Sequence, residues 1–339
     1  MRLVLAGINH RQAPLELRER FSLSASDSDL LALALREKGM VAGAVILSTC
    51  QRVELYAEAQ DAEAIKRFFL NFKGLNVNLG RYLYVKYNGE ALTHLFNVSS
   101  GLDSQIIGEY EILQQVRDAY LKARGGEVTT PLLNKLFERA LFVGKLVRQQ
   151  TGISKTGPSI AQSAVYSAEA LCGCLAQKKV YIIGAGAIAG KVAQLCAQRG
   201  AACIIVANRT FQKAQKLSCA INGRAVKFEE FYLLLKDADI LFSATASRHF
   251  ILKKESFQGR EGRQKEIIIF DLAFPRDIDP GVAQLEGIRL FNLDDLKQYA
   301  MARDEETRKA FALAREKAQR FLEKEGQRWN IESACVPAA

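Results

Sequence analysis

The sequence has few histidines and no cysteine spacing typical of a disulfide framework. Three histidines and seven cysteines occur in 339 residues. Cys172-Gly-Cys174 is a close pair, but three histidines leave little to complete a zinc site around it. Cys196, Cys203 and Cys219 fall on apolar faces of expected helices and strands, which predicts that they lie in the core. We therefore expect neither a disulfide framework nor a metal site.

Long apolar segments are also missing. No run approaches the ~20 residues that a membrane-spanning helix needs. The N-terminus from Met1 to His10 lacks an apolar signal segment of adequate length and a cleavage site. The composition, with 49% hydrophobic and 25% charged residues, is ordinary for a globular protein, and the length allows two or three domains. These features predict a cytoplasmic protein without a membrane partner.

The chain carries a modest positive charge. Lys and Arg number 47 against 37 Asp and Glu, which gives a formal net charge of +10. A positive excess favours a polyanionic partner such as nucleic acid and raises the rate of encounter with it. Four basic residues of the helix expected at 131–150 fit either a solvated face or a surface that contacts phosphates: Lys135, Arg139, Lys145 and Arg148.

The first 150 residues are expected to form an α+β domain. Apolar runs bounded by polar turns predict its strands. A helix among them has N-caps at Ser26-Asp-Ser-Asp29 and stops at Gly39. The expected strands are residues 3–8, 45–47, 53–56 and 82–87. This order predicts an antiparallel sheet with helices on one face, followed by a helical segment from Gly89 to Gln150.

Cys50 differs from the other cysteines because it has polar neighbours at the end of an apolar strand. The strand Val45-Ile-Leu47 gives way to Ser48-Thr-Cys-Gln-Arg52. A free cysteine has a pKa of about 8.5, and a nearby Arg lowers it. Arg52 is therefore expected to favour the thiolate of Cys50. A small buried core residue is the other interpretation of this stretch.

From Lys178 onward the pattern alternates between strand and helix. The strand Val180–Ile183 runs into a glycine turn that opens a helix, and a second strand follows at Cys203–Ala207. This is the dinucleotide-binding arrangement, in which the pyrophosphate sits on the helix N-terminus and the backbone approaches it closely. Residues 160–291 are therefore expected to form a Rossmann domain. The expected cofactor contacts in the turn are Gly184, Ala185, Gly186, Ala187, Ile188 and Ala189.

The end of the second strand indicates which nicotinamide cofactor binds. NAD sites usually place an Asp or Glu there to bind the ribose 2′-hydroxyl. This chain has Asn208, Arg209 and Thr210, with no carboxylate to repel a 2′-phosphate and a guanidinium to bind it. The sequence therefore predicts NADPH rather than NADH.

Residues 292–339 are expected to form a C-terminal part dominated by one long helix. The helix is charged and rich in alanine, and it is expected to run from Leu293 to about Glu325. Its apolar side can pack on the body of the protein or on another subunit. The apolar positions are Ala310, Phe311, Leu313, Ala314, Ala318, Phe321 and Leu322.

Taken together, these stretches resemble the glutamyl-tRNA reductase family. The resemblance covers most of the chain, from Gly7 to about Asp295, and several motifs in the family's order are more specific than any single one. The motifs are Ser48-Thr-Cys-Gln-Arg52, Gly101-Leu-Asp-Ser-Gln-Ile-Ile-Gly-Glu109 followed by Gln115, Gly144-Lys-Leu-Val-Arg148 with Thr151, Gly184-Ala-Gly186, Ala207-Asn-Arg-Thr210 and Asp271-Leu-Ala-Phe-Pro-Arg-Asp-Ile-Asp-Pro280.

The resemblance implies NADPH-dependent reduction of the glutamyl group on tRNA(Glu) to glutamate-1-semialdehyde, the first step of the five-carbon route to tetrapyrroles. It implies that a Cys50 thiolate displaces the tRNA and leaves a thioester, which accepts hydride readily. His94 corresponds to the histidine that the family keeps near its nucleophile, and both proton transfer and polarisation of the carbonyl are open roles for it. Glutamyl-tRNA(Glu) is the implied partner, with glutamate-1-semialdehyde aminotransferase as a second one.

The resemblance also implies a pocket for the glutamyl group. Arg52 is expected to bind the side-chain carboxylate bidentately, with Thr49 and Gln51 as further polar contacts. The remaining pocket residues that match family positions are Ser104, Glu109, Tyr110, Glu111 and Gln115. Each of these also fits helix capping or a solvated face.

The chain departs from the family's pattern in three places. Gln51 stands where Asn is commoner. The pair Tyr110-Glu111 replaces a Pro/Gln-type pair and adds a charge that would repel the substrate carboxylate if it pointed inward. The family usually continues into a helical dimerisation domain, so we expect either a monomer or a homodimer that pairs through the helix at 293–325 alone.

Two other functions fit parts of the sequence. A shikimate-dehydrogenase-like NADP oxidoreductase shares the glycine turn and the Asn-Arg-Thr end of the second strand, but it does not need Cys50. A non-catalytic relative that binds tRNA or haem would fit the shortened C-terminus and Glu111. The presence of Cys50, Arg52 and His94 argues for an enzyme.

Overall fold

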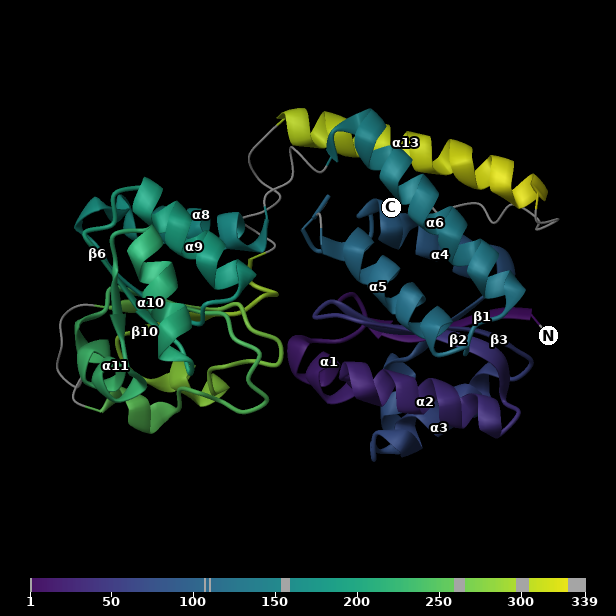
Figure 1. Ribbon diagram of the computed structural model, residues 1–339, viewed down its shortest axis with the longest axis horizontal. Helices are drawn as coiled ribbons and strands as arrows, with labels where there is room; N and C mark the ends of the chain where they lie inside the picture. The colour runs from purple at the N-terminus through teal and green to yellow at the C-terminus, as the bar shows by residue number, and fades with distance from the viewer. Residues whose placement is uncertain are drawn as a thin grey trace. The chain divides into compact units, whose positions relative to one another are not determined.

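The computed structural model describes residues 2–106, 108–109, 111–153, 159–258, 266–296 and 305–328. The chain divides into two compact units. One unit comprises Met1–Gly157 and Asp304–Ala339, and the other comprises Pro158–Arg303. Each unit has its own sheet (Figure 1). Each also has its own hydrophobic core. The mixed α/β architecture predicted from the sequence is therefore confirmed.

The first unit is built on a four-stranded antiparallel sheet with the strand order β2-β3-β1-β4. Its strands are β1 (Arg2–Asn9), β2 (Val41–Ser48), β3 (Arg52–Ala59) and β4 (Tyr84–Tyr87). β2 and β3 form a hairpin in which Ser48 pairs with Val53, and β1 pairs with β3 so that Asn9 lies opposite Arg52. Three residues, 49–51, connect the two hairpin strands.

Helices cover both faces of this sheet. On one face lie α1 (Leu15–Phe21), α2 (Ala25–Glu37) and α3 (Ala62–Phe72) (Figure 1). The sequence predicted helices on one face, and the structure adds a second helical layer on the other. α2 begins earlier than its predicted caps, because Ser24 accepts a hydrogen bond from the Asp27 N–H and Asp27 accepts one from the Ser24 N–H. On the other face lie α4 (Asn88–Ser100), α5 (Glu111–Gly125) and α6 (Pro131–Thr151).

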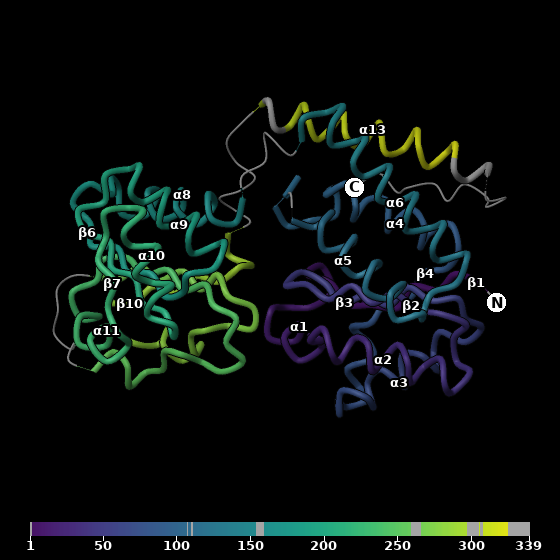
Figure 2. Tube along the Cα trace, in the orientation of Figure 1, coloured from purple at the N-terminus to yellow at the C-terminus, as the bar shows by residue number. Residues whose placement is uncertain are grey.

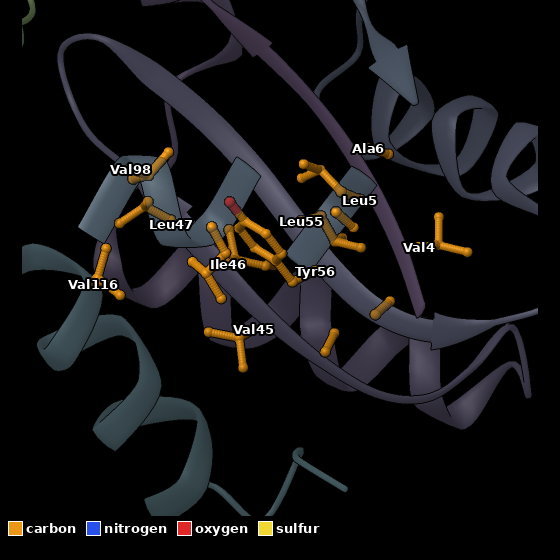
Figure 3. Packing of buried hydrophobic residues seen from close by; sticks show 14 of the residues in the cluster. Val4, Leu5, Ala6, Val45, Ile46, Leu47, Leu55, Tyr56, Val98 and Val116 are labelled. Atoms are coloured by element: carbon orange, nitrogen blue, oxygen red, sulfur yellow. The ribbon is translucent and has the colours of Figure 1, made fainter. Parts of the chain in front are cut away.

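Strands β1, β2 and β3 are buried along nearly their whole length because both faces are covered, whereas β4 at the edge of the sheet is half-buried. Val45 and Ile46 of β2 and Leu55 and Tyr56 of β3 are buried and project between the covering layers (Figure 3). The Tyr56 ring meets Phe137 of α6 edge-on at 5.4 Å between ring centroids. Burying one such side chain stabilises the fold by roughly 1.5–3 kcal/mol. The sheet is therefore a rigid support for the loop between β2 and β3.

α4 and α6 cross at close range beside this sheet. Gly144 of α6 has no side chain, and a Cβ atom there would lie 2.7 Å from the Ser99 carbonyl oxygen of α4 and 3.0 Å from Leu113. Such distances are too short for any residue with a side chain. Gly101 follows the last residue of α4, and its φ of 76° is the left-handed conformation typical of a glycine after a helix.

The second unit contains a six-stranded parallel sheet with the order β10-β9-β8-β5-β6-β7. This is the order of a doubly wound dinucleotide-binding fold, and the order reverses between β5 and β8. The strands are β5 (Lys179–Ile183), β6 (Cys203–Ala207), β7 (Arg224–Val226), β8 (Ile240–Ser243), β9 (Ile267–Asp271) and β10 (Ile288–Phe291). Its α-helices are α8 (Ile160–Cys172), α9 (Ala187–Gln198), α10 (Phe211–Ala220) and α11 (Phe228–Leu234).

Short 3-10 helices complete the connections in both units. They are η1 (Val77–Tyr82), η2 (Leu175–Gln177), η3 (Leu235–Asp237), η4 (Lys254–Phe257) and η5 (Pro280–Gln284).

The cysteines of the second unit differ in exposure. Cys196 is buried as predicted, Cys203 is half-buried and Cys219 is exposed. The prediction for Cys219 was wrong, because α10 turns only Ala214 and Ser218 inward. The cysteines in the described ranges are free thiols.

The long C-terminal helix, α13 (Glu305–Arg328), lies along α6 and α4 of the first unit (Figure 2). Among the residues of α13 whose burial is described, Ala310, Ala314, Ala318 and Leu322 are buried. The sequence predicted one helix from Leu293, but residues 293–296 form a turn. Residues 297–304 of that predicted helix lie outside the described residues. No helix in the described ranges is long and apolar enough to cross a membrane.

Replacing Gly144 by Ala is expected to lower the free energy of unfolding by about 1–3 kcal/mol, because the added methyl group overlaps the backbone of α4. Gly125→Ala is the matched control, since no described atom lies within 4 Å of a Cβ built there. The control should stay within about 0.5 kcal/mol of wild type. Urea unfolding of the three proteins measures both effects, and equal losses would contradict a close crossing of α4 and α6.

Candidate functional site

Cys50 lies in the turn between β2 and β3. The Thr49 hydroxyl accepts hydrogen bonds from the backbone N–H groups of Gln51 and Arg52, both at 3.2 Å, and the Thr49 N–H donates to the Arg52 carbonyl at 2.8 Å. Arg18 of α1 is fully buried and donates from Nε to the Cys50 carbonyl oxygen at 3.0 Å. These bonds fix the backbone on both sides of a half-buried thiol.

The thiol of Cys50 is not held as a thiolate in this structure. Burial, followed by the charge of Glu109, raises its pKa to about 12. Arg18 and Arg52 act in the opposite direction but do not outweigh burial. Arg52 lowers the pKa of the thiol as predicted, but the prediction of a thiolate was wrong, because burial and the charge of Glu109 raise the pKa by more than the two arginines lower it. At neutral pH the thiol needs a proton acceptor before it can act as a nucleophile.

Arg52 is fully buried and lies between two carboxylates. Its Nη1 donates to Glu54 Oε1 at 2.9 Å and to Asp103 Oδ2 at 2.8 Å, and its Nη2 donates to the Asp103 carbonyl at 2.5 Å. Nε is buried and has no acceptor among the described residues. A buried donor without a partner is rare in proteins and is a candidate contact for a ligand. Asp103 also pairs at 2.7 Å with Arg11, which is largely exposed.

Glu54 joins Arg52 to His94. Its Oε1 accepts hydrogen bonds from Tyr84 at 2.5 Å and from His94 Nε2 at 2.7 Å, and its Oε2 accepts one from Tyr56 at 2.7 Å. Burial opposes the charge of Glu54, yet His94 and Arg52 hold its pKa well below the usual range. Glu54 is therefore strongly favoured in its ionised form.

Gln51 connects the Cys50 turn to Glu109. Its Nε2 donates to both carboxyl oxygens of Glu109 at 3.0 Å, and its Oε1 accepts from the Gln105 N–H at 2.8 Å. Burial raises the pKa of Glu109 to about 7. The Ser104 hydroxyl opposes this shift, and the charge of Glu111 adds to it. Glu109 therefore changes charge near neutral pH beside the thiol.

The structure brings together most of the residues expected around Cys50. Thr49, Gln51, Arg52, Ser104 and Glu109 are buried in the first unit, and His94 joins them through Glu54.

Two other pocket residues lie outside this buried set. Glu111 and Gln115 lie on the exposed side of α5, although the charge of Glu111 reaches Glu109. Tyr110 lies outside the described residues.

Three participants were not assigned from the sequence. Glu54, Asp103 and Arg18 hold Arg52, His94 and the backbone of Cys50 in place. A signal was present for Glu54, since a charged residue inside the apolar strand Val53-Glu-Leu-Tyr56 must be paired when both faces of the sheet are covered. Arg18 carried no such signal, because its turn of helix reads as an ordinary polar segment.

The second unit presents a nucleotide-binding edge. Gly184 follows β5 with a φ of 113°, and a Cβ atom there would lie 2.3 Å from the Ala244 carbonyl oxygen. Gly186 caps α9, and no described atom lies within 4 Å of a Cβ built on it. The N-terminal turn of α9, which contains Ala187, Ile188 and Ala189, offers N–H groups that the helix leaves unused. This geometry fits a pyrophosphate.

The end of β6 carries the three residues expected to select the cofactor. Asn208 Nδ2 donates to the Thr210 carbonyl at 3.0 Å, which closes the turn, and Arg209 is exposed. An exposed guanidinium at this position fits the 2′-phosphate of NADPH.

A network at the ends of β8 and β9 supports the same edge. Asp277 accepts hydrogen bonds from the Ser243 hydroxyl at 2.6 Å and from the Thr245 hydroxyl at 2.6 Å. Asp271 accepts from the N–H groups of Ala273 and Ile278. Ligands of doubly wound folds bind outside the carboxyl ends of the strands, so these bonds shape the loops there.

Among the residues that the structure describes, no group of three or more His, Cys, Asp or Glu side chains is placed to hold a metal ion.

Two family models match this chain, and the boundary between their matches lies in the same region as the boundary between the two compact units. Residues 6–151 match the family model of the glutamyl-tRNA(Glu) reductase N-terminal domain. Residues 166–299 match the model of shikimate/quinate 5-dehydrogenase. The second match covers the nucleotide-binding unit and leaves the unit that contains Cys50 unmatched.

Several relatives resemble nearly the whole chain. A glutamyl-tRNA reductase of Carboxydothermus hydrogenoformans is 40% identical over 320 residues, which cover 93% of this chain and 71% of the relative. One of Desulfitobacterium hafniense is 36% identical, with 98% and 77% covered. The solved structure of glutamyl-tRNA reductase from Methanopyrus kandleri is 33% identical with a TM-score of 0.50, and the match covers 96% of this chain and 81% of that one.

The raised pKa of Glu109 predicts a pH dependence of stability. The folded protein binds this proton more tightly than the unfolded chain does, so stability is highest at low pH and falls as the pH rises from about 4.5 to about 7. Glu109→Gln removes this dependence. Between pH 5 and pH 8, the free energy of unfolding of wild type should fall by up to about 3 kcal/mol relative to that of the variant.

Urea unfolding of wild type and variant at the two pH values measures this difference. Glu111→Gln changes an exposed acid of the same neighbourhood and should keep most of the dependence. Parallel curves for wild type and Glu109→Gln would show that Glu109 is already ionised at pH 5.

Proposed function

Because the chain belongs to the glutamyl-tRNA reductase family, we propose that it reduces the glutamyl group of glutamyl-tRNA(Glu) with NADPH and releases glutamate-1-semialdehyde. It is an enzyme of the oxidoreductase class, and the reaction is the first step of tetrapyrrole synthesis. The observation that carries the proposal is the position of Cys50, a thiol in a fixed turn with Gln51–Glu109 on one side and Arg52–Asp103 on the other.

The first chemical step is attack of the Cys50 sulfur on the carbonyl carbon of the glutamyl ester. A carbon–sulfur bond forms, the ester bond to the tRNA ribose breaks, and the glutamyl group remains on Cys50 as a thioester. The thiol loses its proton and the departing ribose oxygen gains one. Residues near Cys50 must therefore transfer one proton from the thiol to the ribose oxygen and end the step in the protonation state in which they began.

Arg52 and Gln51 are proposed to hold the glutamyl group during this step. Arg52 Nε is a buried donor without a protein acceptor among the described residues, which suits an oxygen of the substrate. The bidentate contact with the side-chain carboxylate remains a prediction. Because Gln51 bonds to Glu109, the charge of Glu109 is felt both by the thiol and by an incoming carboxylate.

The second unit is proposed to bind NADPH, which supplies the hydride that reduces the thioester. Gly184 and Gly186 allow the pyrophosphate to approach the backbone, and the N-terminal turn of α9 faces its charge. Arg209 would pair with the 2′-phosphate. The thiol of Cys50 is regenerated when the aldehyde departs.

The alternative functions have less support. The shikimate-dehydrogenase type corresponds to residues 166–299 alone, whereas the relatives that cover 93% and 98% of the chain are glutamyl-tRNA reductases. A regulatory relative would not require Cys50, Glu54 and His94 to lie in one buried region. The transfer of product to an aminotransferase, the formation of a homodimer and a cytoplasmic location remain predictions.

Cys50→Ser is expected to abolish formation of the thioester. The test incubates the protein with radiolabelled glutamyl-tRNA in the absence of NADPH and measures acid-stable label on the protein. Wild type should carry label that hydroxylamine removes, and the variant should carry none, because a serine hydroxyl is a far weaker nucleophile at neutral pH. Cys219→Ser removes an exposed thiol of the second unit and should label like wild type.

The outcome separates the candidate functions. Full labelling of Cys50→Ser would overturn the role of Cys50. No label on wild type, with tRNA and NADPH both bound, would favour the regulatory relative. No label and no tRNA binding would favour the shikimate-dehydrogenase type.

Arg209→Glu is expected to raise the KM for NADPH at least about tenfold, since it replaces a charge-assisted contact with repulsion. The KM for NADH should change little, because NADH has no 2′-phosphate. Lys253→Glu makes the same change of charge at another exposed position of this unit and serves as the control. Steady-state kinetics with both cofactors measures the two KM values. An equal rise in the KM for NADH would show that Arg209 has a structural role instead.

A further inference from the structure

Glu54 is surrounded by hydrogen-bond donors. It lies in the middle of the sheet on β3 with 0% of its surface exposed. Arg52 Nη1, the Tyr84 hydroxyl and His94 Nε2 lie within 2.9 Å of its Oε1, and the Tyr56 hydroxyl lies 2.7 Å from its Oε2. A carboxylate that accepts four hydrogen bonds is strongly favoured in its ionised form.

The protonation of the neighbours follows from this arrangement. Burial and the charge of Glu54 raise the pKa values of Tyr56 and Tyr84 well above the usual range. Both tyrosines therefore keep their protons and donate to the carboxylate. A carboxylate has only acceptor atoms, so the nitrogen of His94 that approaches it must also carry a proton.

His94 is therefore restricted to one tautomer when its ring is neutral. Nε2 bears the hydrogen and donates to Glu54, and Nδ1 bears the lone pair. No described residue forms a hydrogen bond with Nδ1. The ring is held on a second side by Tyr84, with 5.7 Å between the ring centroids. The backbone beneath it belongs to α4, which α6 holds at close range through Gly144.

We propose that Glu54 is a positioning residue that holds His94 with its Nε2 protonated and leaves Nδ1 as the atom that exchanges a proton with the substrate. This inference rests on the proposed function, because it assigns the working atom of His94 in that reaction. The proton leaves the Cys50 thiol, is carried on Nδ1, and passes to the ribose oxygen as the ester bond breaks. No other reactant is needed, and His94 ends the step neutral.

A purely structural role for Glu54 makes a different prediction. Arg52 is paired with Asp103 as well as with Glu54, so a structural contribution of Glu54 would act through Arg52 and would not depend on His94. The two roles can be separated by a readout at His94 and by the dependence of one substitution on the other.

The first measurement is nuclear magnetic resonance of protein labelled with ¹⁵N-histidine, at about pH 9, well above the ordinary pKa of a free imidazole. Three histidines give few signals, and His10→Gln and His249→Gln assign two of them. Wild-type His94 should show a protonated Nε2 and a bare Nδ1, with the Nε2 proton far downfield and slow to exchange. Glu54→Gln should move that proton upfield, because a neutral amide oxygen is a weaker acceptor than a carboxylate.

Two matched controls keep the His94–Glu54 bond. Tyr56→Phe removes the donor from the other carboxylate oxygen, and Asp103→Asn removes the other carboxylate of Arg52. Both should leave the His94 signals as in wild type. A wild-type His94 with its proton on Nδ1 would overturn the inference without any variant having to fold.

The second measurement is a double-mutant cycle on thioester formation with labelled glutamyl-tRNA. Glu54→Gln should slow the wild-type rate at least about tenfold, and it should have little further effect in a His94→Asn background. Equal losses in both backgrounds would overturn the inference and assign Glu54 to the structure alone.

The two measurements also separate this inference from the proposed function. Absence of thioester in wild type together with the expected His94 tautomer would overturn the function and the proton path. Thioester formation together with the other tautomer would overturn the role of Glu54 and leave the function standing.

Discussion

The burial of one guanidinium in the middle of a covered sheet constrains the whole first unit. Arg52 has no access to water, so its charge must be balanced by protein groups, and Glu54 and Asp103 supply that balance. Each carboxylate then fixes another part of the chain: Glu54 orients His94 of α4, and Asp103 anchors the segment that leads to Glu109. Removing either partner leaves a buried charge, which typically costs 3–5 kcal/mol.

The same burial determines the reactivity of Cys50. A thiol close to two arginines would ordinarily ionise readily, but here one guanidinium is balanced by carboxylates and the other bonds to backbone carbonyls. The low-polarity surroundings then dominate and the thiol stays protonated. A thiol of this kind resists oxidation and reacts only where a base and a substrate are both in place.

Much of this arrangement can be predicted from the sequence. The contacts that could not be predicted share one cause, which is that they join residues far apart in the chain. Apolar patterns predicted the strands and the long helix, and the glycines predicted the turn before α9. These patterns reflect local geometry. Cys50, Gln51 and Glu109 stood in recognisable motifs. The pairing of Glu54 with His94 and of Arg18 with Cys50 joins residues 40 and 32 positions apart, so no local pattern could reveal it. The sign of the Cys50 pKa shift depended on the burial that folding creates and on the charge of Glu109, which no local pattern could reveal either.

α13 brings a constraint of a different kind. The helix packs on α4 and α6 of the first unit, yet it follows the complete second unit in the chain. On the ribosome, the apolar face formed by α4 and α6 therefore stays uncovered while about 150 further residues are made, and domains fold as units during synthesis. Ala314 and Ala318 cover that face last. The apolar face of α4 and α6 is therefore exposed to aggregation until the second unit has been translated and α13 has been made.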